Sequence, residues 1–246
     1  MNLKKTENII VLGIFLGIIG ALSAGIMAYF AELTRKPIAE MQMSRTNKAL
    51  KELLPDFDNQ PSQDTITVKS NDEQKYPVKF YVAKKGAKVV GLAGEAYTMK
   101  GYGGELVAMA GLALDGRIRT VIITKQNETP GLGTVVTSRK YVTTIFNLLG
   151  IGKKIDTSKL PPNPILDQFD GHAADKSDSW AQPWKVRKDG GNVNFVTGAT
   201  VSSRAVTEVV FRIASTYMAN KNEILNKFEG ASTEKPSANS SRSNKQ

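Results

Sequence analysis

A group of side-chain hydroxyls at the predicted start of the last helix is the strongest candidate for chemistry in this sequence. The segment Thr197–Ser203 has the sequence Thr-Gly-Ala-Thr-Val-Ser-Ser. Thr200, Ser202 and Ser203 lie where N-cap hydroxyls are expected, and the free N–H groups of a helix N-terminus favour a phosphate group. The small pair Gly198-Ala199 leaves Thr200 sterically open. The pattern favours a phosphate near Thr200; a simply capped helix is the alternative, and it does not explain the Gly-Ala pair.

Two further segments contain glycine where strands and helices would avoid it. Gly101-Tyr102-Gly103-Gly104 lies between two predicted strands, and Glu128–Gly133 has the sequence Glu-Thr-Pro-Gly-Leu-Gly. Taken alone, each segment is most simply a turn. The first also lacks the spacing of a dinucleotide-binding fingerprint and has no helix after it. Composition alone therefore assigns no function to either segment.

The composition limits the redox chemistry that is open to the chain. It has no cysteine and one histidine, His172, which excludes iron–sulfur clusters, Cys-based zinc sites, c-type haem attachment and disulfides. Electron transfer would therefore need an organic cofactor. His172 and the nearby Asp167, Asp170 and Asp175 allow a metal site or a polar surface loop, and the loop is favoured. We predict no catalytic residue and no metal ligand.

An uncharged apolar stretch near the N-terminus covers residues 9–30. It is long enough to cross a hydrocarbon core of about 30 Å, so we expect an uncleaved membrane helix there. A cleaved signal peptide is the alternative, because Ala21, Ser23 and Ala24 are small. Its apolar region would be shorter, about 7–15 residues.

The charges say little about orientation or partners. The 33 Lys and Arg against 23 Asp and Glu give a formal net charge of +10. Basic residues flank both ends of the apolar stretch, so the positive-inside rule leaves its orientation open. They are scattered along the chain rather than clustered, and we expect no nucleic-acid partner. The excess positive charge is compatible with anionic lipid or acidic partners.

Beyond the membrane helix, the periodicity predicts an α+β fold, with an antiparallel sheet and flanking helices. Two hairpins are expected between residues 78 and 124, with turns at Lys85-Gly86 and Asp115-Gly116. The other expected elements are, in chain order, a helix within 31–54, a polar loop at 56–75, a loop at 125–133, a helix around 141–149, a hairpin at 184–196 and a helix at 202–228.

The three motifs together resemble a known family. Thr197–Ser203 is similar to the flavinylation motif (S/T)-G-A-(S/T)-x-(S/T) of the G subunit of the Rnf ion-translocating electron transport complex. The same motif is found in the related C subunit of the sodium-pumping NADH:quinone reductase. Glu128–Gly133, the Gly101–Gly104 turn and the single N-terminal span also match those families. The segment 184–191 resembles the Rnf protein in particular, and the resemblance covers nearly all of the chain except its tail.

The resemblance implies a membrane-anchored flavoprotein with a covalent cofactor. Thr200 would carry FMN as a phosphoester, attached by a separate Mg²⁺-dependent flavin transferase. The protein would relay electrons among the subunits of an Rnf-type complex, without independent catalysis. It would cross the inner membrane once, with its FMN domain on the periplasmic side. The residues that the resemblance places in cofactor binding are Thr200, Thr197, Gly198, Ala199, Ser202, Ser203, Glu128, Thr129, Gly131, Leu132, Gly133 and Gly103.

The domain organisation follows from these expectations. Backbone N–H groups of the two glycine segments, with Glu128 and Thr129, are expected to hydrogen-bond the flavin ring. The expected parts are a short segment at 1–8, a transmembrane helix at 9–30, a helical linker at 31–55, an FMN-binding domain at 56–229 and a disordered tail at 230–246.

Some positions depart from the family pattern or have two interpretations. Asn194 lies where many relatives have Asp, which bears on recognition by the transferase. Asn127 lies where His commonly precedes the Glu, which bears on hydrogen bonding to the flavin. Lys125 either favours a reduced, anionic flavin or is a solvated side chain at a strand end. The alternatives for the whole protein are a quinone-reductase C-type subunit, another membrane-tethered flavoprotein, and an anchored, non-redox binding module.

Overall fold

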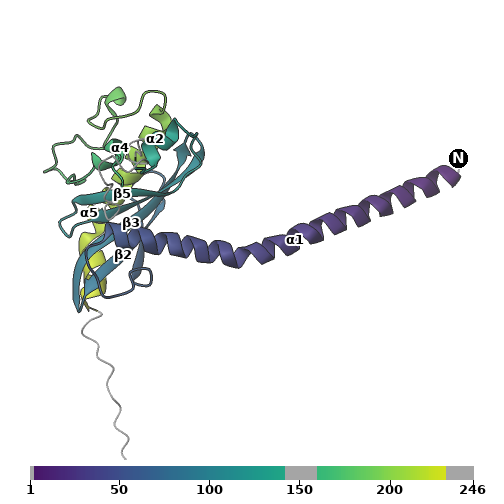
Figure 1. The fold of residues 1–246 in the computed structure, drawn as a ribbon, viewed down its shortest axis with the longest axis horizontal. Helices are drawn as coiled ribbons and strands as arrows, with labels where there is room; N and C mark the ends of the chain where they lie inside the picture. Colours follow the sequence, from purple (N-terminus) through teal and green to yellow (C-terminus); the bar gives the residue numbers. More distant parts are fainter. Residues whose placement is uncertain (1–2, 142–159, 231–246) are drawn as a thin grey trace, which may run out of the picture. The chain divides into compact units, whose positions relative to one another are not determined.

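The computed structural model describes residues 3–141 and 160–230 (Figure 1). The chain divides into two compact units, Met1–Thr46 and Asn47–Gln246. The helix predicted around 141–149 lies almost entirely outside the described residues, and so do residues 231–246 of the predicted tail.

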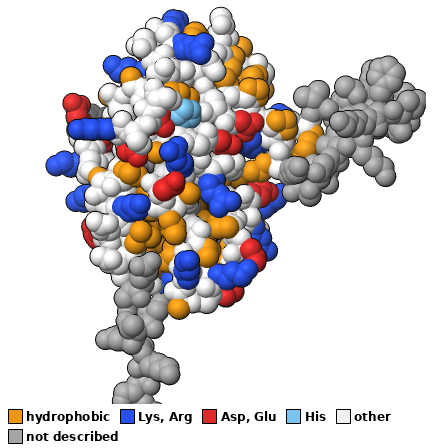
Figure 2. Space-filling view, turned by 90° about the vertical axis from the view of Figure 1, so that its left-hand side faces the viewer, with side chains coloured by type: hydrophobic (Ala, Val, Ile, Leu, Met, Phe, Trp, Pro, Cys, Tyr) orange, Lys and Arg blue, Asp and Glu red, His pale blue; other side chains and the backbone are white. Residues whose placement is uncertain are grey.

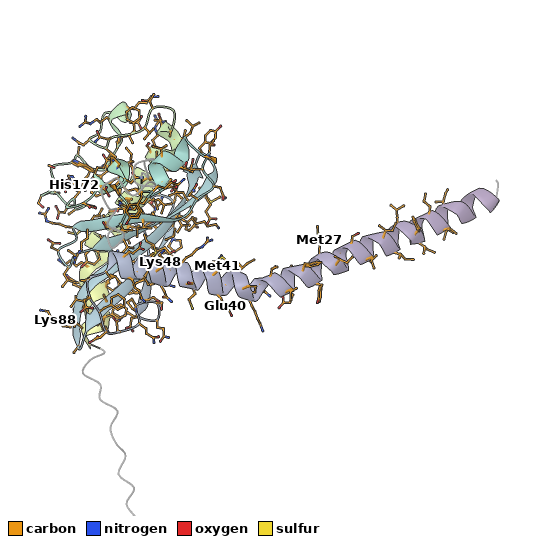
Figure 3. All side chains as sticks on the ribbon, viewed as in Figure 1. Met27, Glu40, Met41, Lys48, Lys88 and His172 are labelled. Carbon is orange, nitrogen blue, oxygen red and sulfur yellow. The ribbon has the colours of Figure 1, made fainter. Side chains whose placement is uncertain are left out.

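The first unit consists of most of helix α1 (Leu3–Leu53). From Ile9 onward the helix contains a window with a mean hydropathy of 2.6, and none of that window is buried. Met27, Glu40 and Met41 are exposed on α1 (Figure 3). Within the described residues, α1 is the one helix that is long and apolar enough to cross a membrane.

The second unit is built on a five-stranded antiparallel sheet in the order β1-β2-β3-β4-β5. The predicted α+β class and the two hairpin turns are confirmed, with Gly86 and Gly116 at positive φ values of 62° and 101°. The expectation of a continuous polar loop over 56–75 is wrong, because a short strand within it pairs with β2. The strands are β1 (Thr65–Lys69), β2 (Pro77–Lys85), β3 (Lys88–Gly101), β4 (Gly104–Leu112) and β5 (Ile118–Lys125).

One face of the sheet carries the main core. Helix α5 (Thr200–Gly230), predicted over 202–228, packs mainly against β3 and β4 (Figure 1). Every third or fourth residue of α5 is apolar and buried, as expected for a helix that covers a sheet. The fully buried side chains from both elements include Phe80, Leu92, Leu106, Leu112, Val206, Val209, Val210, Ile213 and Tyr217. This packing fixes the position of the N-terminus of α5.

The opposite face of the sheet is covered by the last turns of α1. Ala49, Leu50 and Leu53 of this segment, together with Leu54 directly after it, are buried and pack against Tyr81, Ala83, Ala93 and Met109. Gly111 on β4 allows the close approach, since a Cβ atom there would lie 2.5 Å from the carbonyl oxygen of Leu53. The domain therefore includes the end of α1.

Short elements complete the domain between β5 and α5. They are α2 (Gly133–Thr137), α4 (Pro164–Asp167) and the 3₁₀ helix η1 (Arg187–Asp189). The hairpin predicted at 184–196 is wrong. Asp189 ends the 3₁₀ turn, and Gly190 follows it in the left-handed conformation. Val186 and Val193 form a single parallel bridge, which antiparallel hairpin strands would not make.

We expect Gly111→Ala to lower the free energy of unfolding by about 1–3 kcal/mol, because the added methyl group must displace the end of α1. Denaturant unfolding of the full chain in detergent measures the loss, and hydrogen exchange at the amides of residues 49–54 should rise. Arg119→Ala, an exposed change on the adjacent strand, is the control and should stay within about 0.5 kcal/mol. Equal effects of the two substitutions would contradict the close contact.

Candidate functional site

The three glycine-containing motifs meet at the N-terminus of α5. Gly103 packs against the backbone of Asn127 so closely that a Cβ atom would overlap the Asn127 carbonyl oxygen. A Cβ atom at Gly198 would contact Leu132, with 3.7 Å to its Cδ2 atom. The β3–β4 turn, the loop after β5 and the start of α5 are therefore neighbours.

A buried hydrogen bond joins the loop after β5 to α5. Ser202 Oγ donates to Glu128 Oε2 at 2.7 Å, and the two residues are only 1% and 6% exposed. Gly133 leaves room for this pair, because a Cβ atom there would lie 2.9 Å from Ser202 Oγ. Within the described residues, Glu128 has no salt bridge. Its other oxygen, Oε1, lies beside Gly101.

The hydroxyl groups of the first helical turn differ in their bonding. Ser203 Oγ donates to the carbonyl of Ala199 at 3.0 Å and accepts from the N–H of Val196 at 3.3 Å. The N-cap expectation is wrong for Thr200, Ser202 and Ser203, because α5 begins at Thr200 and Ala199 holds the N-cap position. Thr200 Oγ1 has no hydrogen-bond partner in the described part of the chain. Thr200 is therefore half-buried with a free hydroxyl.

The backbone around Thr200 also has free donors. The N–H groups of Thr200, Val201 and Ser202 have no acceptor among the described residues, whereas the N–H of Ser203 bonds to Ala199. The first N–H groups of a helix lie at the positive end of its dipole, where a phosphate group is stabilised. The residues present at the start of α5 therefore fit a phosphate ester on Thr200.

Each of the three motifs exposes a large apolar side chain. Tyr102, Leu132 and Val201 come from the three motifs and are 72%, 50% and 43% exposed. Thr129 and Gly131 are exposed on the same loop, where the N–H of Gly131 donates to the Thr134 hydroxyl at 2.9 Å. Thr197 and Gly198 are exposed as well. These motifs therefore offer exposed apolar side chains on which a flat, partly apolar group could pack.

Lys125 and His172 have partners of their own. Lys125 Nζ lies 2.5 Å from the Glu105 carboxylate. His172 Nδ1 lies 3.0 Å from Asp178, and its ring stacks on Trp180 with 3.7 Å between the ring centroids. Within the described residues, no three or more His, Asp or Glu side chains gather as metal ligands would. The structure does not group His172 with Asp167, Asp170 and Asp175.

A cavity of about 630 Å³ extends along α5 beyond Thr200. Arg204 and Phe211, four and eleven residues after Thr200 on the same helical face, line it. Trp184 and Val186, from the segment that resembles the Rnf protein, form an apolar wall. None of the residues predicted for cofactor binding lines this cavity, and no local pattern in the sequence indicates it.

Ion pairs border the cavity. Arg212, only 2% exposed, binds Asp72 and Glu208, and Lys100 Nζ lies 2.9 Å from Glu208. Arg204 binds Asp189 through two hydrogen bonds, and this guanidinium holds the pKa of the Asp189 carboxyl below its usual value. The pairs Arg212–Asp72 and Lys100–Glu208 join segments far apart in the sequence, which is why local patterns could not predict them.

Charges of both signs are mixed on the domain surface. Figure 2 shows Lys and Arg side chains interspersed with Asp and Glu over one face, with His172 among them. On that face, the described basic residues form no continuous stripe of the kind that tracks a nucleic-acid backbone.

Comparisons with known proteins identify similar chains. The model of the FMN-binding domain matches residues 101–215. The G subunit of the ion-translocating oxidoreductase complex of Cereibacter sphaeroides is 31% identical over 218 residues, which is 88% of this chain and 87% of the relative. Its counterpart from Photorhabdus laumondii is 30% identical, over 82% of this chain and 87% of the relative. The G subunit of the Na⁺-translocating ferredoxin:NAD⁺ oxidoreductase complex of Acetobacterium woodii is 28% identical, over 81% and 86%.

We expect Ser202→Ala to destabilise the domain by about 1.5–3 kcal/mol, because it leaves the buried Glu128 carboxylate without its hydrogen-bond donor. Ser203→Ala, the matched control one residue away, removes bonds to local backbone only and should cost about 0.5–1.5 kcal/mol. Denaturant unfolding of both variants measures the difference. In the background of Glu128→Ala, the effect of Ser202→Ala should shrink, and purely additive losses would count against the bond.

Proposed function

This chain belongs to the family of G subunits of ion-translocating oxidoreductase complexes and contains an FMN-binding domain, and from this premise we propose that it transfers electrons through an FMN esterified to Thr200. It is an electron-transfer subunit of an oxidoreductase complex. The observation that supports attachment at Thr200 is that, among the described residues, its hydroxyl and the neighbouring helix N–H groups have no hydrogen-bond partner. The other subunits of the complex are its electron donor and acceptor.

The attachment chemistry needs a second enzyme. A Thr hydroxyl is a weak nucleophile without a base or a metal ion to activate it. Glu128 is the acidic residue of the three motifs, and in the described part of the chain its carboxylate already accepts a hydrogen bond from Ser202. A flavin transferase with Mg²⁺ would therefore supply the activation. Thr200 Oγ1 loses its proton to a base of the transferase and bonds to the phosphorus of an activated flavin phosphate, whose leaving group departs with the electron pair of the broken P–O bond.

The bound FMN supplies the one-electron redox chemistry, and the residues of this chain orient it. The N–H groups of Thr200, Val201 and Ser202 stabilise the single negative charge of the phosphodiester. Leu132 and Val201, both exposed, would pack against the flavin and keep water from it. Glu128, together with Thr129 and the backbone of the loop after β5, provides hydrogen-bonding groups that tune the flavin potential.

The membrane helix supports the anchoring of the chain in a membrane. Residues 9–30 contain no charged side chain, so α1 offers no path for an ion, and ion movement belongs to the partner subunits. We propose that α1 crosses the membrane once and that the FMN domain lies on the periplasmic side. An ester bond keeps the flavin in place where free FMN is scarce.

We expect co-expression with a flavin transferase to raise the mass of the chain by that of one FMN less one water molecule. Thr200→Val should abolish the addition, because no oxygen is left to form the ester. Thr197→Val, the matched control in the same motif, should keep it. Intact-mass measurement, together with flavin fluorescence on a denaturing gel, decides between them. An unmodified wild-type chain would contradict the proposal.

The absence of cysteine makes the orientation testable with single-cysteine variants. Lys88, exposed at the β2–β3 turn (Figure 3), is changed to Cys, and Thr6, before the span, is changed to Cys in a second variant. We expect a membrane-impermeant maleimide to label Lys88→Cys in intact spheroplasts and to label Thr6→Cys only after lysis. The reverse pattern would put the FMN domain in the cytoplasm.

A further inference from the structure

Arg204 lies one turn after Thr200 and is held in place by one carboxylate. Its Nε and one terminal nitrogen, Nη2, donate to the two oxygens of Asp189 at 2.7 and 2.6 Å. A guanidinium group has five N–H donors, so this pairing leaves the other terminal nitrogen, Nη1, available. Nη1 has no hydrogen-bond partner in the described part of the chain. Asp189 therefore fixes the orientation of the Arg204 guanidinium, which keeps Nη1 as a hydrogen-bond donor for another group.

The helix geometry brings this group toward Thr200. Residues four apart on a helix have Cβ atoms about 5–6 Å apart on one face. Long side chains in helices lean toward the helix N-terminus and cover the preceding turn. For Arg204, the preceding turn is the one that begins with Thr200. A group attached to Thr200 Oγ1 would lie within reach of the free guanidinium nitrogen.

The charges near Arg204 favour an anion despite the presence of Asp189. The Asp189 carboxyl is influenced by three cations, Arg204, Lys188 and Lys185, and all three lower its pKa. The pairing with Asp189 in turn raises the pKa of Arg204, so that residue stays charged. Of these four groups three are cationic and one is anionic, and Glu208, one turn farther along α5, is itself paired with Lys100 and Arg212. A phosphodiester brings a single negative charge to these groups.

We propose that Arg204 binds the phosphodiester that FMN forms with Thr200, and that Asp189 is a positioning residue which holds the guanidinium for that contact. The proposal rests on the proposed function, because it needs FMN on Thr200. One side of the planar group binds the carboxylate, and the nitrogen on the other side binds a phosphate oxygen. A Lys ammonium could supply the charge but not this two-sided geometry.

The test compares loaded and unloaded forms of the full chain in detergent. Wild type, Arg204→Gln, Arg204→Lys and Asp189→Asn are each co-expressed with a flavin transferase, and occupancy is read by intact mass. The ³¹P NMR resonance of the phosphodiester reports its contacts directly. The rise in Tm on loading, taken against the same variant carrying Thr200→Val, separates flavin contacts from a purely structural role of Arg204. Arg187→Gln removes an exposed charge from η1, the 3₁₀ helix that also contains Asp189, and is the matched control.

We expect Arg204→Gln to shift the ³¹P resonance and to remove most of the rise in Tm, while Arg187→Gln changes neither. Arg204→Lys and Asp189→Asn should give intermediate values, because each keeps the charge but loses its orientation. Lower occupancy in Arg204→Gln than in Arg187→Gln also supports the contact. Full occupancy with an unchanged resonance and an unchanged rise in Tm would overturn it. A wild-type chain without the FMN mass would overturn the ester itself, an outcome read separately from the comparison of variants.

Discussion

The candidate site depends on one buried hydrogen bond, from Ser202 to Glu128. Ser202 is fixed by helix α5, which is packed on the sheet, while Glu128 belongs to a loop with little core of its own. A buried carboxylate without a counterion is costly unless its oxygens accept hydrogen bonds. The Ser202 hydroxyl and the positive end of the α5 dipole stabilise that charge together. The loop is therefore held at the helix N-terminus, and Leu132 is held beside Gly198.

The sheet links the start of α5 to the end of α1. Strands β3 and β4 carry α5 on one face, through residues such as Leu92 and Leu106, and the end of α1 on the other, through Ala93 and Met109. Because side chains of a strand alternate between faces, the same strands serve both helices. The end of α1 and the start of α5 are thus attached to one rigid element, and the site does not depend on flexible linkage within the domain.

The parts of the fold that sequence could predict are those with local signals. The Asp115-Gly116 turn joins two alternating segments, and α5 has a clear helical period, so both are predictable. Strand β1 is not, because its five residues lie among polar ones and form a strand through pairing with β2. The Asp189-Gly190 dipeptide is typical of a hairpin, but it ends a 3₁₀ turn, since Val186 and Val193 pair in parallel.

The candidate site also has features that the sequence could predict and features that it could not. Its three motifs could be found from glycine and hydroxyl spacing, but the bonds that distinguish its residues could not. Nothing in the sequence around Arg212 indicates Asp72, which is 140 residues away, or assigns Ser202 to Glu128 rather than to a helix cap. Long-range ion pairs and buried hydrogen bonds depend on how the elements pack. The cavity that these pairs border therefore exists only in the folded chain.

The difference among the hydroxyls of the first α5 turn explains why one of them suits modification. A hydroxyl that donates to a buried acceptor must give up that bond to become an ester, and the acceptor then loses its donor. An ester on Ser202 would leave Glu128 without its donor. An ester on Ser203 would break the bonds of the Ser203 hydroxyl to the Ala199 carbonyl and the Val196 N–H. Among the described residues, Thr200 has no such bond to lose. The proposed esterification there would add an anion where, in the same part of the chain, N–H groups are free, so it would break none of these hydrogen bonds.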